Sequence, residues 1–160
     1  MQRFLDAQAG VWDSVISELT VGRKQSHWMW FVFPQLCGLG RSHTARKFAI
    51  TDLFAAKEYL DHPILGVRLR TCTMLVCAQI PPTPLTEIFP PPDNLKFKSS
   101  MTLFKLAALS ATDQNLFTQA LVQYCDGKCC ELTQKTLRQS HQRGIPPASA
   151  EAVLEDPPSA

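Results

Sequence analysis

A segment over residues 23–42 gathers side chains that suit a negatively charged ligand. Cations, hydroxyls and amides hold anions through charge and hydrogen bonds, and an indole offers a flat face on which a base can stack. Arg41 and Ser42 directly precede an expected helix, whose N-terminus adds a further attraction for anions. From this segment we expect ligand contacts from Lys24, Ser26, Trp28, Trp30, Gln35, Arg41 and Ser42.

His27 lies in the middle of the same segment. An imidazole titrates near neutral pH and can act as an acid or a base, so His27 is the predicted catalytic residue if the ligand reacts. A structural interpretation competes with this one, because Trp28, Phe31 and Phe33 belong to a run of four aromatic residues in six positions. Such a run is typical of a hydrophobic core.

In a second segment, residues 93–104, one lysine and two serines stand at helical spacing. At helical spacing Lys96, Ser99 and Ser100 share one face, so we expect all three to contact the ligand. The alternative is an ordinary amphipathic helix whose lysines face water. We predict that the two segments converge on one pocket, although they are far apart in the sequence.

Three runs of residues resemble the domain-of-unknown-function 1810 family. They are Lys-x-Ser-His-Trp-Met-Trp-Phe-x-Phe-Pro-Gln over 24–35, Gly-Leu-Gly-x-Ser over 38–42, and Asp-x-Leu-Lys-x-x-Ser-Ser-Met-Thr-Leu-Phe over 93–104. The resemblance covers about residues 2–140 and implies an intracellular, mostly helical single domain, without an established reaction. Some relatives are labelled calpastatin, but calpastatins are disordered repeat inhibitors, whereas this composition is globular.

The charge of the chain is unevenly distributed. The net charge is +2, from 16 basic and 14 acidic residues, yet residues 22–50 hold five cations and no acid. Residues 144–160 hold three acids and no base. A nearly neutral chain is not typical of a nucleic-acid-binding protein, so we do not expect a nucleic-acid partner. No apolar run reaches the ~18 residues of a membrane span, and no secretory signal is recognisable, so we expect a cytoplasmic protein.

The six cysteines are expected to be reduced thiols in that compartment. Two weaker alternatives use them. Cys125, Cys129 and Cys130 could bind zinc together with His141, although their spacing matches no common zinc pattern. Cys37 could pair with a histidine, either His27 or His43, although no orienting acid is nearby. We therefore expect no metal and no cofactor.

The hydrophobic pattern predicts an all-α fold, a single compact domain of roughly six to eight helices with irregular loops. Helices are expected over 3–20, 43–49, 53–60, 64–80, 95–109, 114–126 and 129–141, with shorter turns at 27–33 and 86–89. Gly22 is expected to end the first of these helices, and four side chains are expected to cap later ones: Ser42, Asp52, Asp93 and Asp113. The predicted domain spans 1–143, and the Pro- and Ala-containing acidic tail over 144–160 is expected to be disordered.

The leading functional hypothesis is a domain that binds a small anionic or nucleotide-like ligand in a basic and aromatic pocket, with His27-dependent catalysis if a reaction occurs. The alternative is a protein-interaction module that presents Trp28 and Trp30 to a protein partner, because exposed Trp is frequent at binding hot spots. The burial of these two indoles discriminates between the hypotheses.

Overall fold

Helices form the regular structure of the chain in the computed structural model, which describes residues 1–80 and 82–142. They are α1 (Gln2–Ala9), α2 (Trp12–Val21), α3 (Met29–Val32), α4 (His43–Lys47), α5 (Leu53–Asp61), α6 (Leu65–Cys77), α7 (Leu85–Ile88), α8 (Asp93–Ala107), α9 (Ala111–Cys125) and α10 (Glu131–Gln142). The predicted all-α fold is confirmed, with more helices in the described residues than expected. The predicted disordered tail lies outside the described residues.

The long helix predicted over residues 3–20 is two helices, α1 and α2. Gly10 ends α1, and the chain turns there before α2 begins at Trp12. Glycine is unfavourable inside a helix because it loses more backbone freedom than other residues, which explains why the apolar pattern alone overestimated the helix length. Gly22 ends α2 in the left-handed conformation, with φ of +74°, as its position predicted.

Two predicted helix caps are confirmed and two are wrong. Ser42 caps α4 and Asp52 caps α5, each by accepting a hydrogen bond from the backbone N–H three residues later. Asp93 is instead the first residue of α8, and Ser110 replaces Asp113 as the cap of α9. Both carboxylates pair with partly exposed cations instead: Asp93 with Lys24 and Lys96, and Asp113 with Arg70.

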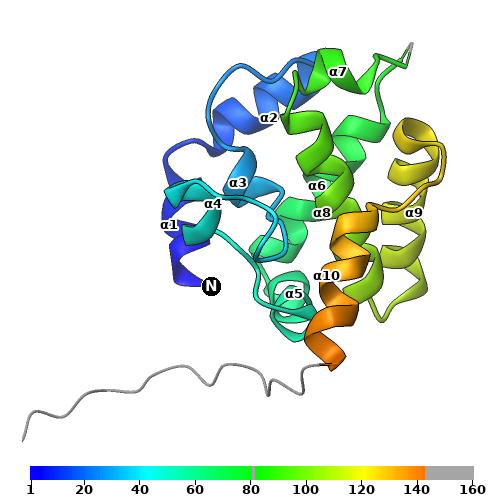
Figure 1. The fold of residues 1–160 in the computed structure, drawn as a ribbon. Helices are drawn as coiled ribbons and strands as arrows, with labels where there is room; N and C mark the ends of the chain where they lie inside the picture. Colours follow the sequence, from blue (N-terminus) through cyan, green and yellow to red (C-terminus); the bar gives the residue numbers. More distant parts are fainter. Residues whose placement is uncertain (81, 143–160) are drawn as a thin grey trace, which may run out of the picture.

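Helix α8 lies in the middle of the molecule, with α9 and α10 on one side and α1, α3 and α4 on the other (Figure 1). Its inner face joins an aromatic core in which Phe97 contacts Phe89 and Phe33 at ring-centroid distances of 5.2 and 5.1 Å. Trp28 packs edge-on against Phe89 at 6.2 Å. The structural interpretation of Trp28, Phe31 and Phe33 is therefore correct, because all three are buried.

The loop that carries Gly38, Arg41 and Ser42 is closed at its base by backbone hydrogen bonds. Cys37 N–H donates to the carbonyl of Ile50 at 2.7 Å, and Ile50 N–H donates to the carbonyl of Gln35 at 2.8 Å. These bonds fix where Arg41 and Ser42 emerge relative to α3.

None of the helices in the described residues has the length and hydrophobicity needed to cross a membrane.

Candidate functional site

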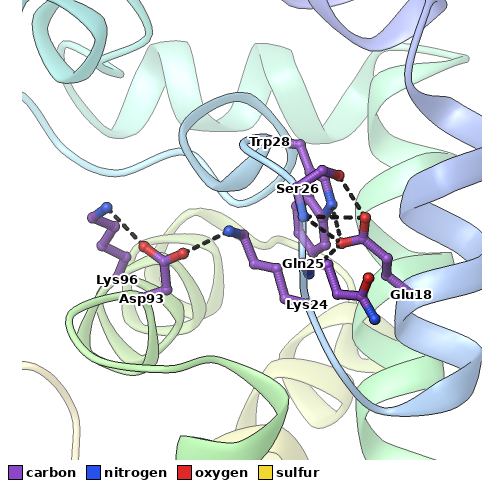
Figure 2. A network of polar contacts seen from close by, with 7 residues as sticks. All are labelled: Glu18, Lys24, Gln25, Ser26, Trp28, Asp93 and Lys96. Atoms are coloured by element: carbon purple, nitrogen blue, oxygen red, sulfur yellow. Dashed lines mark hydrogen bonds and ion pairs between the residues drawn. The ribbon is translucent and has the colours of Figure 1, made fainter.

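A carboxylate on α2 organises the first predicted segment. Glu18 accepts hydrogen bonds from Gln25 N–H at 2.7 Å, from the indole N–H of Trp28 at 2.8 Å, and from both the N–H and the hydroxyl of Ser26 (Figure 2). Burial raises the pKa of Glu18, but the hydrogen bonds from Ser26, Gln25 and Trp28 outweigh it and hold the pKa below its ordinary value. Ser26 and Trp28 are thus used to position the segment.

The two predicted basic segments converge on a single carboxylate. The ammonium groups of Lys24 and Lys96 each lie 2.8 Å from a different oxygen of Asp93, which they reach from opposite sides (Figure 2). Burial raises the pKa of Asp93, but hydrogen bonds and charge from both lysines outweigh it and lower the pKa overall. The Lys24 side chain is only 8% exposed, so Asp93 neutralises it within the protein.

Beside this ion cluster is a cleft of about 700 Å³ with three walls. The first wall comes from α3 and the following loop and includes Trp30, Gln35, Leu39, Arg41 and Ser42. The second is α8 with the residue before it, including Pro92, Leu95, Lys96, Lys98 and Ser99. The third is the start of α10 and the residues that precede it, 128–132. A cleft of this volume is the size of a small-molecule site.

The cleft combines an apolar interior with a basic rim. Trp30 and three leucines, Leu39, Leu95 and Leu132, supply the apolar surface. The ammonium of Lys96 lies 4.3 Å from the centre of a Trp30 ring, a cation–π distance. Among the described residues, the Lys and Arg side chains that line the cleft are Arg41, Lys96, Lys98 and Lys128, and the one Asp or Glu side chain that lines it is Glu131. Arg41 and Lys98 form no ion pair within the described residues, so their charges are available to a ligand.

Hydroxyl groups fasten the third wall to the second. The hydroxyls of Ser99 on α8 and Thr133 on α10 are 2.7 Å apart, and both side chains are buried. The backbone N–H of Cys130 donates to the hydroxyl of Thr102 at 2.8 Å. These contacts set the start of α10 against the middle of α8 and so complete the cleft.

The structure brings about half of the predicted ligand contacts to this cleft. They are Trp30, Gln35, Arg41, Ser42, Lys96 and Ser99. Five other predicted site residues do not line it: Lys24, Ser26, His27, Trp28 and Ser100. Lys24 pairs with Asp93, Ser26 and Trp28 bind Glu18, Ser100 is buried inside α8, and His27 is exposed elsewhere.

Sequence reasoning did not identify the third wall or Lys98. Lys98 shares the helical face of Leu95 and Ser99, and that spacing was the available signal. For Cys129 and Cys130 the signal was their position immediately before a helix. All six cysteines are free thiols. Within the described part of the chain, no group of His, Cys, Asp and Glu side chains is arranged to hold a metal ion, and the His141 side chain lies outside that part.

Comparison with known proteins identifies a family but not an activity. The chain is similar to a solved structure, the conserved hypothetical protein Rv1873 from Mycobacterium tuberculosis, with 47% identity and a TM-score of 0.81 over 86% of this chain and 95% of that one. Curated proteins give no match. Residues 1–137 match the family described as "Protein of unknown function (DUF1810)". Because this match covers most of the chain, the protein belongs to the DUF1810 family.

Proposed function

We propose that the cleft binds a small anionic ligand with a flat or apolar body, such as a nucleotide. The observation that carries this proposal is the exposed basic rim around an aromatic and aliphatic interior. Arg41 and Lys98, which form no ion pair within the described residues, would attract phosphate or carboxylate groups, whereas Lys96 pairs with Asp93 and Lys128 lies 4.0 Å from Asp126. The half-buried ring of Trp30 and the neighbouring leucines offer the surface on which a base or another apolar group can pack.

The rim supplies different types of anion contact. Arg41 presents a planar guanidinium that can form two parallel hydrogen bonds to one phosphate or carboxylate. Lys98 presents a compact charge from the opposite wall, and Gln35 adds an amide close to Trp30. Lys96 is shared between Asp93 and the Trp30 face, so it contributes less free charge than Lys98. The ligand would therefore lie with its anionic group toward Arg41 and Lys98.

The protein-interaction alternative is less well supported. It requires Trp28 and Trp30 to project together as an exposed anchor, but Trp28 has no exposed surface. His27 has no part in this proposal, because it is exposed outside the cleft and no bound group would contact it there.

The test is a binding series with ADP, pyrophosphate and adenosine, measured by thermal shift and calorimetry. ADP should bind most tightly, because the other two compounds each carry only one of its recognised halves. At about 100 times its dissociation constant, ADP should stabilise the protein by roughly 2.7 kcal/mol. Added salt should weaken binding, because the rim is exposed and its charges are screened.

Matched variants locate the site. Lys98→Ala should weaken ADP binding about tenfold, equivalent to ~1.4 kcal/mol, whereas Lys135→Ala on the exposed face of α10 should not change it. Asp93→Asn should tighten binding, since it releases the charge of Lys96. The proposal is refuted if neither ADP nor an aromatic carboxylate such as salicylate binds at millimolar concentration, or if both lysine variants behave alike.

A further inference from the structure

Cys130 occupies the point where the cleft meets α10. It directly precedes Glu131, the first residue of the helix, and it is half-buried in the cleft wall. Cys130 caps α10: its carbonyl accepts a hydrogen bond from Gln134 N–H at 3.1 Å, so the N–H groups of Leu132 and Thr133 in the first turn lie on the side of its sulfur. The hydroxyl pair of Ser99 and Thr133 lies beside the sulfur and has one proton left to donate to it, because the other proton joins the two hydroxyls. Ser99 and Thr133 are almost completely buried and bonded to each other, so these donors are held in place.

Such an arrangement stabilises the negatively charged form of sulfur. Burial raises the pKa of the Cys130 thiol, but the hydrogen bonds from Thr133, Ser99 and Leu132 outweigh burial and lower the pKa overall. Other cysteines show what burial does without these donors: it raises the pKa of Cys72 to about 12 and that of Cys77 to about 11.

A reactive thiolate must also be accessible to its reaction partner, and the cleft gives a charged molecule access to Cys130. The charged groups that line it with Cys130 are Lys96 and Lys98 from α8, Lys128 and Glu131 beside the sulfur's own residue, and Arg41 from the opposite loop. A small anion held by this rim would therefore lie within the same cavity as the sulfur. Cys72, in contrast, has no exposed surface and cannot meet such a molecule.

We propose that Cys130 is a nucleophile that forms a mixed disulfide with small, negatively charged disulfides bound in the cleft, such as those of carboxylate-bearing thiols. The proposal rests on the anion-binding function proposed above and names a class of ligand for the same site. The thiolate sulfur attacks one sulfur of the bound disulfide, a new S–S bond forms to Cys130, and the old S–S bond breaks. The displaced sulfur leaves with the electron pair as a thiolate and takes a proton from water. No further oxidant is needed.

The experiment treats the intact protein with limiting disulfide at about pH 6, where an ordinary thiol is almost fully protonated, and maps each modified cysteine by peptide mass spectrometry. Three probes of different charge are compared: glutathione disulfide, which is anionic, 2-hydroxyethyl disulfide, which is neutral, and cystamine, which is cationic. Cys130 should be modified at least tenfold faster than the exposed Cys37. Glutathione disulfide should react with Cys130 faster than cystamine, and added salt should reduce that difference.

Variants separate two effects on Cys130: stabilisation of its thiolate by hydrogen-bond donors, and attraction of anionic disulfides by the basic rim of the cleft. Thr133→Val should slow modification of Cys130 at pH 6 more than at pH 9, while Lys98→Ala should slow glutathione disulfide but not the neutral probe. If Thr133→Val does not fold, Ser99→Ala provides the same comparison. Cys129→Ser should leave the rate at Cys130 unchanged.

Two results would overturn the proposal: equal or faster modification of Cys37 or Cys129, or reaction of Cys130 with cystamine as fast as with glutathione disulfide. The ADP titration tests the anion site independently of these two results. If ADP binds while Cys130 is unreactive, the nucleophile is refuted and the anion site stands. If Cys130 reacts rapidly with the neutral probe but shows no preference for anions and ADP does not bind, the anion site and the ligand class are refuted together.

Discussion

Replacement of Glu18 by glutamine tests the structural role that we assign to this carboxylate. Both of its oxygens accept hydrogen bonds, from the backbone of Gln25, from Ser26 and from the buried indole of Trp28. Glutamine keeps the shape of the side chain but removes the charge, and it replaces one acceptor oxygen by an NH₂ group that cannot accept. We predict that Glu18→Gln destabilises the fold while leaving its helix content intact.

The magnitude follows from the hydrogen bonds. A hydrogen bond to a charged group contributes roughly 1.5–3 kcal/mol, and a neutral one roughly 0.5–1.5 kcal/mol. Loss of the charge therefore costs about 1 kcal/mol for each of the bonds from Gln25, Ser26 and Trp28. Together these give about 2–4 kcal/mol, a large part of the ~5–15 kcal/mol that stabilises a typical domain.

The effect depends on pH with a defined sign. The pKa of Glu18 is lower in the folded protein than its ordinary value of 4.5, so its stabilising contribution is fully present above that pH. As the pH falls through the folded pKa, the carboxylate becomes protonated and the contribution is lost. The difference in unfolding free energy between wild type and Glu18→Gln should thus be constant between about pH 6 and 8 and shrink at about pH 3.5.

Equilibrium unfolding in urea, followed by tryptophan fluorescence, measures this difference directly. Glu58→Gln is the matched control, because Glu58 is exposed on α5 and its replacement should change stability by less than about 0.5 kcal/mol. Equal stability of the two variants at pH 7 would refute the assigned role. So would a difference that is the same at pH 3.5 as at pH 7.

Two further predictions concern backbone packing and an ion pair. Gly66→Ala should be destabilising by about 1–3 kcal/mol in urea unfolding, because its Cβ would lie 1.9 Å from the carbonyl oxygen of Leu60. Gly10→Ala is the control: nothing lies within 4 Å of that Cβ, so it should stabilise by about 0.4–1 kcal/mol. Arg70→Lys should cost about 1–2 kcal/mol, because the guanidinium contacts both oxygens of Asp113, at 2.6 and 2.8 Å, and an ammonium cannot form this fork. An unchanged thermal midpoint for Arg70→Lys would contradict the account of this ion pair.

Much of the fold could be predicted from the sequence, because local signals at the ends of several helices agree with the tertiary packing. The caps at Ser42 and Asp52 and the end of α2 at Gly22 depend on nearby backbone groups, and all three were predicted. The family resemblance is also confirmed. Asp93 and Asp113 failed as predicted caps because each lies inside the first turn of its helix, where it pairs with a cation distant in the sequence, Lys24 or Arg70.

The candidate site was only partly predictable, because contacts between residues distant in the sequence decide which side chains line it. Spacing within one helix placed Lys96 and Ser99 together, and both line the cleft. The local sequence does not distinguish Trp30 from Trp28. Trp30 lines the cleft, whereas Trp28, two residues earlier, is buried. That difference is set by Glu18 and by the packing of Phe89 against the indole of Trp28.

The way α10 is attached has a consequence for how the protein unfolds. Within its described residues, this helix buries Thr133 and Leu137. Hydroxyl groups join this end of the chain to α8: Thr133 bonds Ser99, and Cys130, the residue before the helix, bonds Thr102. Because little apolar surface holds it, α10 can detach at a lower free energy than global unfolding and with a weak dependence on denaturant. Its amide protons should then exchange with solvent before those of α8. Detachment of α10 would then remove the third wall of the cleft while the aromatic core is still intact.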